Sequence, residues 1–381
     1  MRIAAELIAG FSFKQPFHLW LQEIFRQHKQ FGSKDRKFYR EVFYGYWKLG
    51  KTISQLTAEQ RLLLGLIRLQ PENEQLTQLL PVMFPGHTSS SIPVDFKHLL
   101  GEDWNPYKPF SALLSDKINL TDINLWFGGK APVWVKINPR NREEMITYLN
   151  RNAAEYEEYG PLIIKCGNVN LDEAILRGWC RIQDMSSQES ITESILLGSE
   201  LIWDTCCGAG GKSMLASEAN PHATLYISDT RSQMVHNALM RFSAEGKPRP
   251  FSGTADLSHP VQKLIFDDSM VISKPVFDTL ICDVPCSGSG TWRRTPEMLH
   301  VFSDSELKLF AEKQRKIVTN AVKFLKQGGK LIYLTCSVFS AENEENTKYF
   351  QEEIGLILDS ESYCGGSEKD ADYIYRAVFR K

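Results

Sequence analysis

Strand-like and helical segments alternate along the second half of this 381-residue chain, and this alternation limits its possible folds more than any other feature. Beyond residue 200, short apolar runs typical of buried strands are separated by stretches with helical periodicity. These runs are Leu201–Thr205, Thr224–Ser228, Phe277–Cys282 and Lys330–Leu334, with Tyr373–Phe379 as one more expected strand. Alternation of this kind is typical of β-α-β units. We therefore predict an α/β fold with a mostly parallel, doubly wound sheet.

The first hundred residues have a different, helical pattern. Ser33 is a candidate N-cap, and apolar residues recur at helical spacing after it, from Phe38 and Val42 onward. Proline, glycine and serine interrupt this pattern over residues 81–110, where we expect loops. Residues 70–125 carry no motif to which a function can be assigned. The N-terminal part is therefore predicted to be a helical domain.

A third pattern begins near Pro132. Residues 133–137 read as a strand, 142–152 as a helix and 162–164 as another strand, which predicts a small α+β module. A chain of this length is expected to contain two to three domains. We place them at residues 1–125, 126–190 and 191–381.

The distribution of cysteines and the length of the apolar runs indicate where in the cell the protein is located. Eight cysteines are scattered over a long chain, unlike the crowded cysteines of small secreted proteins. No apolar run approaches the roughly 18 residues of a membrane span. The apolar opening stretch is interrupted by Glu6 and is followed by no small-residue cleavage site. We expect a cytoplasmic protein without a membrane partner.

Positive charge is concentrated near the N-terminus, although the whole chain has a formal charge of −2. Residues 1–51 contain ten Lys or Arg against four acidic residues, and several alternate with aromatic residues. Such a segment suits RNA phosphates and stacked bases. The candidate contacts are Lys34, Arg36, Lys37 and Arg40. A solvated helix face is the alternative interpretation.

A glycine-rich turn follows the first strand of the predicted sheet. Ligands of open α/β sheets bind at the carboxyl ends of the strands, and glycines there allow a close approach of the backbone. The candidate binding residues of the turn are Cys206, Cys207, Gly208, Ala209, Gly210, Gly211 and Lys212. Asp229 ends the second strand, 25 residues after Asp204, where a carboxylate can bind a ribose. Together they indicate an adenosine-containing cofactor, and a nicotinamide-dependent oxidoreductase remains an alternative at this point.

Two cysteines lie at the ends of two further strands. Cys286 follows Asp283 in Asp-Val-Pro-Cys-Ser-Gly-Ser-Gly, and Cys336 lies in Thr-Cys-Ser. The cysteines are 50 residues apart and no histidine cluster accompanies them, so we expect no metal site. Cys166, Cys180 and Cys282 are interpreted as small core residues.

These motifs together resemble the S-adenosylmethionine-dependent RNA cytosine-carbon-5 methyltransferases of the Nop/Sun family. The matching elements are Asp-x-Cys-x-x-x-Gly-Gly-Lys, Asp-x-Pro-Cys-Ser-Gly-x-Gly and Thr-Cys-Ser, and the segments 183–188 and 292–297 are also similar. Residues 35–45 are similar to the NusB-like helical domain of RsmB-type 16S ribosomal RNA methyltransferases. Cys207-Gly208-Ala209 departs from the family's usual Ala-Ala-Pro.

The resemblance implies a Rossmann-like class I methyltransferase fold behind a NusB-like domain. It also implies S-adenosylmethionine as cofactor, held by the glycine-rich turn, Asp229, Asp256 and Asp283. It assigns Cys336 as the nucleophile that adds to carbon 6 of cytosine, Cys286 to the release of that bond, and Asp283 also to binding the base.

The partner implied is RNA, with 16S ribosomal RNA favoured and a monomeric enzyme expected. Two alternatives stay open: a transfer RNA cytosine-C5 methyltransferase and a non-catalytic RNA-binding or ribosome assembly factor. The RNA and the modified nucleotide are not identified by the sequence.

Overall fold

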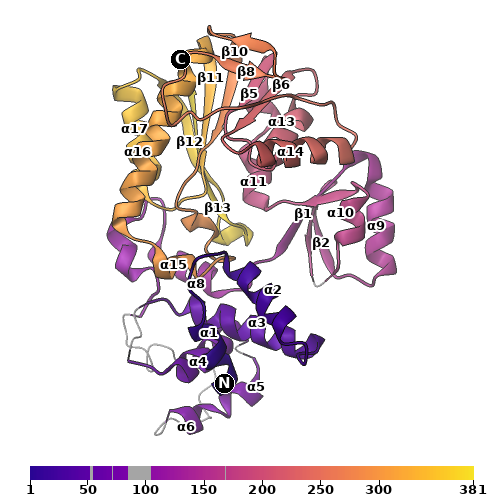
Figure 1. The fold of residues 1–381 in the computed structure, drawn as a ribbon, viewed down its shortest axis with the longest axis vertical. Helices are drawn as coiled ribbons and strands as arrows, with labels where there is room; N and C mark the ends of the chain where they lie inside the picture. Colours follow the sequence, from indigo (N-terminus) through magenta and orange to yellow (C-terminus); the bar gives the residue numbers. More distant parts are fainter. Residues whose placement is uncertain (52–54, 71, 85–103, 168) are drawn as a thin grey trace. The chain divides into compact units, whose positions relative to one another are not determined.

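The computed structural model of this protein describes residues 1–381 except 52–54, 71, 85–103 and 168 (Figure 1). The chain forms two compact units, one of Met1–Ala131 with Thr291–Ser303 and the other of Pro132–Gly290 with Asp304–Lys381. Residues 85–103 of the predicted loop region lie outside the described residues. Among the helices described, none has both the length and the apolar character needed to cross a membrane.

The first unit is helical, as the N-terminal pattern predicts. Its elements are α1 (Arg2–Ala9), α2 (Phe17–Gln27), α3 (Ser33–Lys48), α4 (Ala58–Leu69), α5 (Glu74–Thr77), α6 (Leu80–Met83), η1 (Lys108–Leu113), α8 (Leu120–Gly128) and α15 (Met298–Val301). Buried aromatic residues of α2 and α3, among them Phe17, Trp20 and Phe43, form much of its core. The predicted N-cap is wrong by one residue: Gly32 caps α3, and its N–H donates to the Asp35 carboxylate at 2.9 Å.

Helices α3 and α4 cross where each carries a glycine. A Cβ atom built on Gly65 would lie 2.2 Å from the carbonyl carbon of Gly45, and one built on Gly45 would lie 2.4 Å from that of Gly65. Neither backbone can move away without separating the helices, because Val42, Phe43, Leu62 and the residues around them are buried. The absence of side chains at this crossing therefore sets the packing distance of the two helices.

The second unit begins with the predicted α+β module. It contains β1 (Val133–Ile137), η2 (Pro139–Asn141), α9 (Arg142–Arg151), β2 (Tyr156–Gly160), β3 (Ile163–Cys166), α10 (Asp172–Leu176) and β4 (Cys180–Ile182). The strands form an antiparallel sheet of order β2-β3-β1-β4. This is the β-α-β-β-α-β arrangement of ferredoxin-like folds.

The rest of the second unit is the predicted doubly wound region. Its helices are α11 (Met185–Ser190), α12 (Glu193–Leu196), α13 (Gly211–Ala219), α14 (Ser232–Ala244), α16 (Asp304–Ala321) and α17 (Glu344–Glu352), with η3 (Ser289–Thr291), η4 (Val322–Phe324), η5 (Ser340–Glu342) and η6 (Ser367–Lys369). Its strands are β5 (Leu201–Asp204), β6 (Thr224–Asp229), β7 (Phe251–Thr254), β8 (Leu264–Phe266), β9 (Met270–Ile272), β10 (Phe277–Asp283), β11 (Leu325–Thr335), β12 (Ile357–Gly365) and β13 (Tyr373–Arg380).

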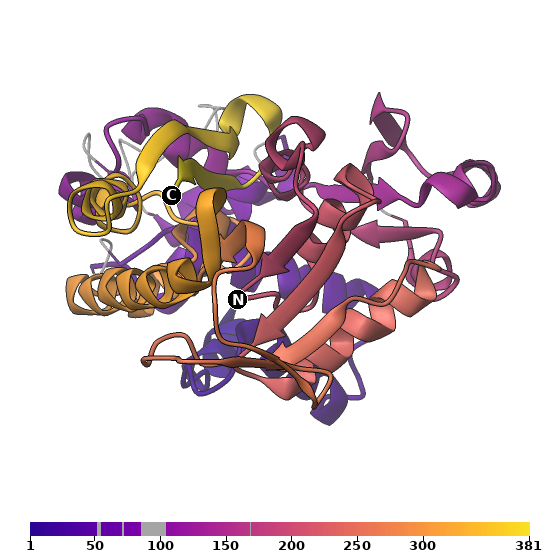
Figure 2. The same ribbon diagram turned by 90° about the horizontal axis from the view of Figure 1, so that it is seen from above.

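Seven of these strands form one twisted sheet of order β12-β13-β11-β10-β5-β6-β7 (Figures 1 and 2). Strands β5, β6, β7, β10 and β11 are parallel, whereas β13 is antiparallel to both of its neighbours. Apolar side chains of α16 and α17 pack on one face, and those of α13 and α14 pack on the other. The fold is the Rossmann-like architecture expected from the sequence.

One face of the module's sheet is covered within the same unit. Arg181 of β4 is nearly buried and forms ion pairs with Glu218 and Glu245, at 2.8 and 2.9 Å. Trp134 of β1 donates its indole N–H to the carbonyl of Asp370 at 3.1 Å. The sheet face that carries Trp134 and Arg181 is therefore used for packing within this unit.

The glycine crossing gives a stability prediction. Gly65→Ala should lower the free energy of unfolding by about 1–3 kcal/mol, because the added methyl group overpacks a rigid helix contact. This loss outweighs the gain of roughly 1 kcal/mol in helix propensity. Chemical denaturation measures the difference.

Gly32→Ala is the control, since its added Cβ meets the Asp35 carboxylate at 3.6 Å, an ordinary contact. It should change stability by less than about 1 kcal/mol. A Gly65→Ala protein as stable as its parent would show that the helices separate at no cost.

Candidate active site

The predicted site residues of the second unit lie at one edge of the large sheet. Strands β5, β6, β7, β10 and β11 run in the same direction, so their carboxyl ends meet there. The glycine-rich turn follows β5, Asp229 ends β6, and Asp256 lies just after β7. Asp283 ends β10, and Cys336 follows β11 directly.

The turn after β5 depends on left-handed backbone at two glycines. Gly208 has φ +49° and Gly210 has φ +84°, conformations that residues with side chains rarely adopt. A Cβ on Gly210 would lie 2.8 Å from that of Ala238, whereas a Cβ on Gly208 would meet nothing within 4 Å. The turn is thus tightly packed behind Gly210 and open beside Gly208. It leads into the N-terminus of α13, whose free N–H groups favour anionic ligands.

Asp204, the last residue of β5, holds the turn in place through a hydrogen bond to α13. Its fully buried carboxylate accepts a hydrogen bond from the Ser213 hydroxyl of α13 at 2.6 Å. Burial raises the pKa of Asp204 to about 7. Sequence reasoning used Asp204 only to mark the end of a strand and missed its role in fixing α13 to β5.

Asp229 links the turn to the end of β6. One of its carboxylate oxygens accepts from the Gly208 N–H at 3.0 Å, and the other accepts from the Arg231 N–H at 2.9 Å. The oxygen bonded to Arg231 N–H also accepts from the Arg231 Nε–H at 3.2 Å, whereas the oxygen bonded to Gly208 keeps a second acceptor site at which a ribose hydroxyl can bind. The fixed carboxylate beside an open glycine turn fits the ribose of an adenosine-containing cofactor.

Asp256 is more exposed than the other candidate carboxylates. It accepts from the hydroxyl and the N–H of Ser258, at 2.5 and 3.0 Å, and lies 3.0 Å from the His259 ring nitrogen. Its hydrogen bonds, that from the Ser258 hydroxyl first, lower its pKa. The N–H of the preceding Ala255 donates to the carbonyl of Asp229, which ties this turn to the ribose candidate.

An ion pair joins the turn to β10. Lys212 Nζ lies 2.7 Å from the Asp283 carboxylate, and both side chains are mostly buried. Burial acts to lower the pKa of Lys212, but the charge of Asp283 and its hydrogen bond outweigh this effect and raise it. The two predicted residues are thus brought into direct contact and fixed as a charged pair.

The two strand-end cysteines are also brought together. Cys286 Sγ and Cys336 Sγ are 3.2 Å apart, and both residues are half-buried free thiols. Their mutual hydrogen bond lowers the pKa of Cys336 and raises that of Cys286. The positive charge of Lys212 also acts to lower the pKa of Cys336. The short contact couples the two thiols, and Cys336 is the one whose pKa is lowered.

Three other cysteines fit their predicted place in the core. Cys166, Cys180 and Cys282 are buried, and burial raises the pKa of each. Cys206 and Cys207, in the glycine-rich turn, also have pKa values raised by burial. Among these cysteines and the strand-end pair, Cys336 alone has a lowered pKa.

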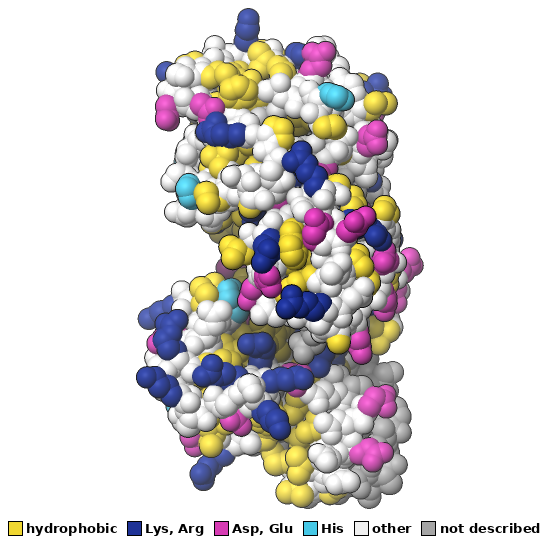
Figure 3. Space-filling view, turned by 90° about the vertical axis from the view of Figure 1, so that its right-hand side faces the viewer, with side chains coloured by type: hydrophobic (Ala, Val, Ile, Leu, Met, Phe, Trp, Pro, Cys, Tyr) yellow, Lys and Arg dark blue, Asp and Glu magenta, His cyan; other side chains and the backbone are white. Residues whose placement is uncertain are grey.

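The four predicted RNA contacts lie in the first unit, on α3, and are all exposed. Lys and Arg side chains gather over this unit in Figure 3. Arg36 and Arg40 line a hollow of about 470 Å³ together with Gln22, Phe25, Arg26 and Lys29. Lys34 and Lys37 do not line it. Sequence reasoning therefore missed Arg26 and Lys29, which come from α2 and the residues after it.

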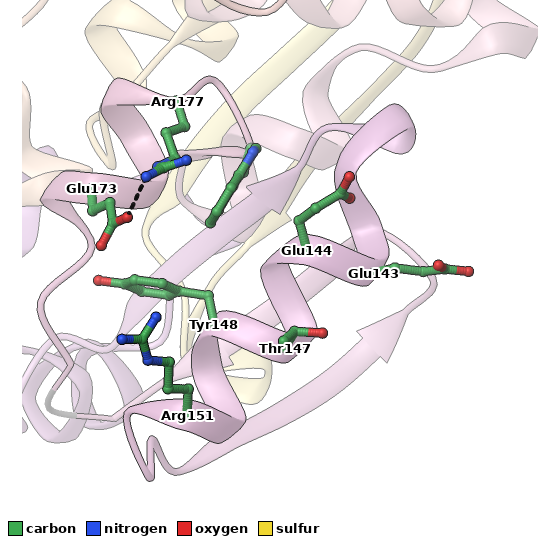
Figure 4. A pocket seen from close by; sticks show the side chains of 8 residues that line it. Glu143, Glu144, Thr147, Tyr148, Arg151, Glu173 and Arg177 are labelled. Carbon is green, nitrogen blue, oxygen red and sulfur yellow. Dashed lines mark ion pairs between the residues drawn. The ribbon is translucent and has the colours of Figure 1, made fainter.

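A second hollow, of about 460 Å³, lies on the helical side of the module (Figure 4). Tyr148 and Trp179 contribute aromatic surface, and the Arg177 guanidinium lies over the Trp179 ring at 5.0 Å. Arg177 also pairs with Glu173 at 2.9 Å. None of its lining residues is among those predicted from the sequence.

Part of this chain is similar to known proteins. Residues 196–357 match the family described as 16S rRNA methyltransferase RsmB/F. Two curated relatives, both named ribosomal RNA small subunit methyltransferase B, come from Serratia proteamaculans and Vibrio cholerae. They are 28% and 29% identical over 232 and 234 residues, 58% of this chain and 51% of each relative. The chain thus spans about half the length of these relatives.

Solved structures share the fold. A crystal structure of PH0851 superposes with a TM-score of 0.71 at 19% identity, covering 100% of this chain and 97% of that one. A methyltransferase homologue from Pyrococcus horikoshii gives a TM-score of 0.56 at 16% identity, covering 81% and 99%. The chain is thus similar to the RsmB/F methyltransferases over residues 196–357 and shares its fold with these solved structures.

Proposed function

We propose that this protein transfers a methyl group from S-adenosylmethionine to carbon 5 of a cytosine in RNA, through a covalent bond between Cys336 and the base. The observation that carries the proposal is the 3.2 Å contact of Cys286 and Cys336 beside the Asp283–Lys212 ion pair. The names of the relatives favour 16S ribosomal RNA as the substrate. Transfer RNA is the alternative.

The cofactor proposal rests on the strand-end geometry. S-adenosylmethionine supplies a methyl group on a positively charged sulfur. The turn from Cys206 to Lys212 would hold its methionine end, Asp229 would bind the ribose, and Asp256 would lie near the adenine. The mostly buried carboxylate of Asp283 would complete the site on the side of the methyl group. Open space beside Gly208 supports this fit.

The attack step uses the asymmetry of the two thiols. Carbon 5 of cytosine is a poor nucleophile, and a thiolate adding to carbon 6 converts the ring into an enamine that can accept a methyl group at carbon 5. Cys336 supplies this thiolate, with its pKa lowered by the Cys286 hydrogen bond. The Asp283 carboxylate accepts hydrogen bonds from the amino group of the base and from N3, which takes a proton from water as Cys336 adds and returns it when carbon 5 takes the methyl group, and so stabilises the adduct.

Release reverses the covalent bond. Cys286 first gives its proton to water and then accepts the proton from carbon 5. The electron pair of that C–H bond restores the carbon 5–carbon 6 double bond, and the carbon–sulfur pair returns to Cys336 as thiolate. One proton is released to water for each methyl group transferred.

The regions around the site divide the work of holding RNA. A base in structured RNA must leave its stack to reach the two cysteines, which favours loops over duplex. We propose residues 1–125 and 126–190 as the RNA-gripping regions and 191–381 as the methyltransferase region of a monomeric cytoplasmic enzyme. Bisulfite sequencing of total RNA with and without the protein would identify the RNA and the cytosine.

The two cysteines give opposite predictions. Cys336→Ala should abolish methylation and any covalent RNA complex, because no other group generates the enamine. Cys286→Ala should allow attack and methylation but impede elimination, so RNA stays attached through Cys336. A denaturing gel with RNA and S-adenosylmethionine should show a shifted band for Cys286→Ala that disappears in the double variant.

Cys282→Ala is the matched control. Cys282 is a buried cysteine of β10, the strand before Cys286, and its variant should behave like the parent. An adduct kept without Cys336 and lost without Cys286 would exchange their roles. Methylation without an adduct in any variant would refute covalent catalysis.

Asp229→Ala tests the cofactor site. It removes a charged acceptor for the ribose, so S-adenosylmethionine affinity should fall by roughly 1.5–3 kcal/mol, as measured by calorimetry. Asp359→Ala is the control, because this carboxylate lies on the edge strand β12 and pairs with Arg380 of β13. Unchanged affinity of the Asp229 variant would remove that residue from the site, and NAD binding would favour an oxidoreductase.

The hollow lined by residues of α2 and α3 indicates which basic residues should matter most for RNA binding. Arg36→Gln with Arg40→Gln should weaken RNA binding and reduce the salt slope by about 0.7 for each phosphate of a single strand that the variant no longer binds. Lys34→Gln with Lys37→Gln removes the same charge outside the hollow and should have a smaller effect. S-adenosylmethionine affinity should not change. Equal losses in both pairs would indicate diffuse charge instead of a phosphate site.

A further inference from the structure

Two buried polar side chains hold the backbone on either side of Cys286. Gln314 of α16 donates its amide N–H to the carbonyl of Pro285 at 3.0 Å. Glu342, at the end of η5, accepts from the N–H of Ser287 at 2.9 Å. Both side chains are fully buried. Cys286 is therefore held between two fixed peptide groups by side chains from two other elements, here named the Gln314–Glu342 clamp.

The clamp is itself fully connected. Glu342 accepts from the Ser287 hydroxyl at 2.6 Å and from the Gln314 amide at 2.8 Å. The Tyr333 hydroxyl lies 2.6 Å from the Glu342 carbonyl oxygen and 2.9 Å from the Gln314 amide oxygen. Tyr333 belongs to β11, the strand that ends at Thr335, directly before Cys336. The clamp thus fixes the backbone around Cys286 relative to β11, the strand that leads into Cys336.

A chain of hydroxyl groups also connects the two cysteine loops. The Ser287 hydroxyl lies 3.3 Å from that of Ser337, the residue after Cys336, and Ser289 lies 3.2 Å from the same hydroxyl. The N–H of Gly290 donates to the carbonyl of Cys336 at 2.9 Å. The sulfur–sulfur distance is therefore set by a network and not by the two side chains alone.

The clamp contains an unusual charge. Within the described part of the chain no Lys or Arg pairs with the Glu342 carboxylate, which is balanced by neutral donors. Burial raises its pKa. A buried carboxylate without a cation is costly, and loss of its partners is strongly destabilising, so a stabilising role alone explains it poorly. Its negative charge acts to raise the pKa of Cys286, which makes the deprotonated Cys286 thiolate a stronger base for the carbon-5 proton.

We infer that Glu342 and Gln314 are positioning residues for the release step, which hold the Cys286 sulfur where it can take the proton from carbon 5 while Cys336 is bonded to carbon 6. This inference rests on the proposed function. Misplacement of a reacting group by about 1 Å can slow a step by roughly a hundredfold. The attack step does not require Cys286 to move and should be less sensitive to the clamp.

Glu342→Gln is the test, because it keeps the shape of the side chain and removes its charge. With RNA and S-adenosylmethionine, release of the methylated RNA should be about ten to a hundred times slower than in the parent. The covalent complex should then accumulate on a denaturing gel. S-adenosylmethionine affinity should be unchanged. Gln314→Met, which removes the bond to Pro285, should give the same adduct if Glu342→Gln does not fold.

Thr347→Val is the matched control. It removes a buried hydroxyl that lies 2.9 Å from the Tyr375 hydroxyl and contacts neither cysteine loop. It should lose comparable stability in thermal unfolding and accumulate no adduct. An adduct in Thr347→Val as well would assign the effect to general loosening and overturn the inference.

A second readout does not need RNA. Peptide mass spectrometry can follow alkylation of Cys286 by iodoacetamide as a function of pH in a Cys336→Ala background. The midpoint should shift to lower pH in Glu342→Gln, since the nearby negative charge is gone. Parental release together with an unshifted midpoint in the folded variant would overturn the inference. If the parent does not methylate RNA and Cys286→Ala forms no adduct, the proposed function is overturned. The shift of the alkylation midpoint then still tests whether Glu342 acts on Cys286.

Discussion

In an open parallel sheet, ligands bind at the carboxyl ends of the strands, and the whole candidate site depends on that constraint. Segments more than a hundred residues apart, from Cys206 to Cys336, meet because each follows a strand that points the same way. The antiparallel β13 lies outside this set and contributes no predicted site residue. Direction of the strands, more than closeness in sequence, selects which residues become neighbours.

The two thiols illustrate how the environment separates chemically identical groups. Lys212 acts to lower the pKa of Cys336, against the charges of Asp283 and Glu342, whereas Glu342 acts to raise the pKa of Cys286. The hydrogen bond between the sulfurs amplifies the difference, because a proton shared by two thiols must favour one of them. Two adjacent thiols with different pKa values can serve as nucleophile and as proton acceptor within one site, so no side chain has to move in from elsewhere.

Much of this arrangement could be predicted from the sequence. The period of apolar residues predicts the sheet, and turn glycines and strand-end acids predict the cofactor side of the site. Gln314 and Glu342 could not be found in this way, because one lies within a helix and the other within a short turn, and neither position carries a local signal. The shift of the α3 cap to Gly32 has a similar cause: the Asp35 carboxylate three residues later binds the backbone of Gly32, so no capping side chain is needed. The burial of Arg181 also depends on acids distant in sequence.

That buried arginine has a practical consequence. Ion pairs shielded from solvent are screened far less by dissolved salt than exposed charges are. The anchorage of the small module through Arg181, Glu218 and Glu245 should therefore persist at ionic strengths that strip polyanions from exposed lysines and arginines. Washing at high salt should therefore remove any polyanion held by exposed charges, while the ferredoxin-like module stays packed against α13 and the end of α14.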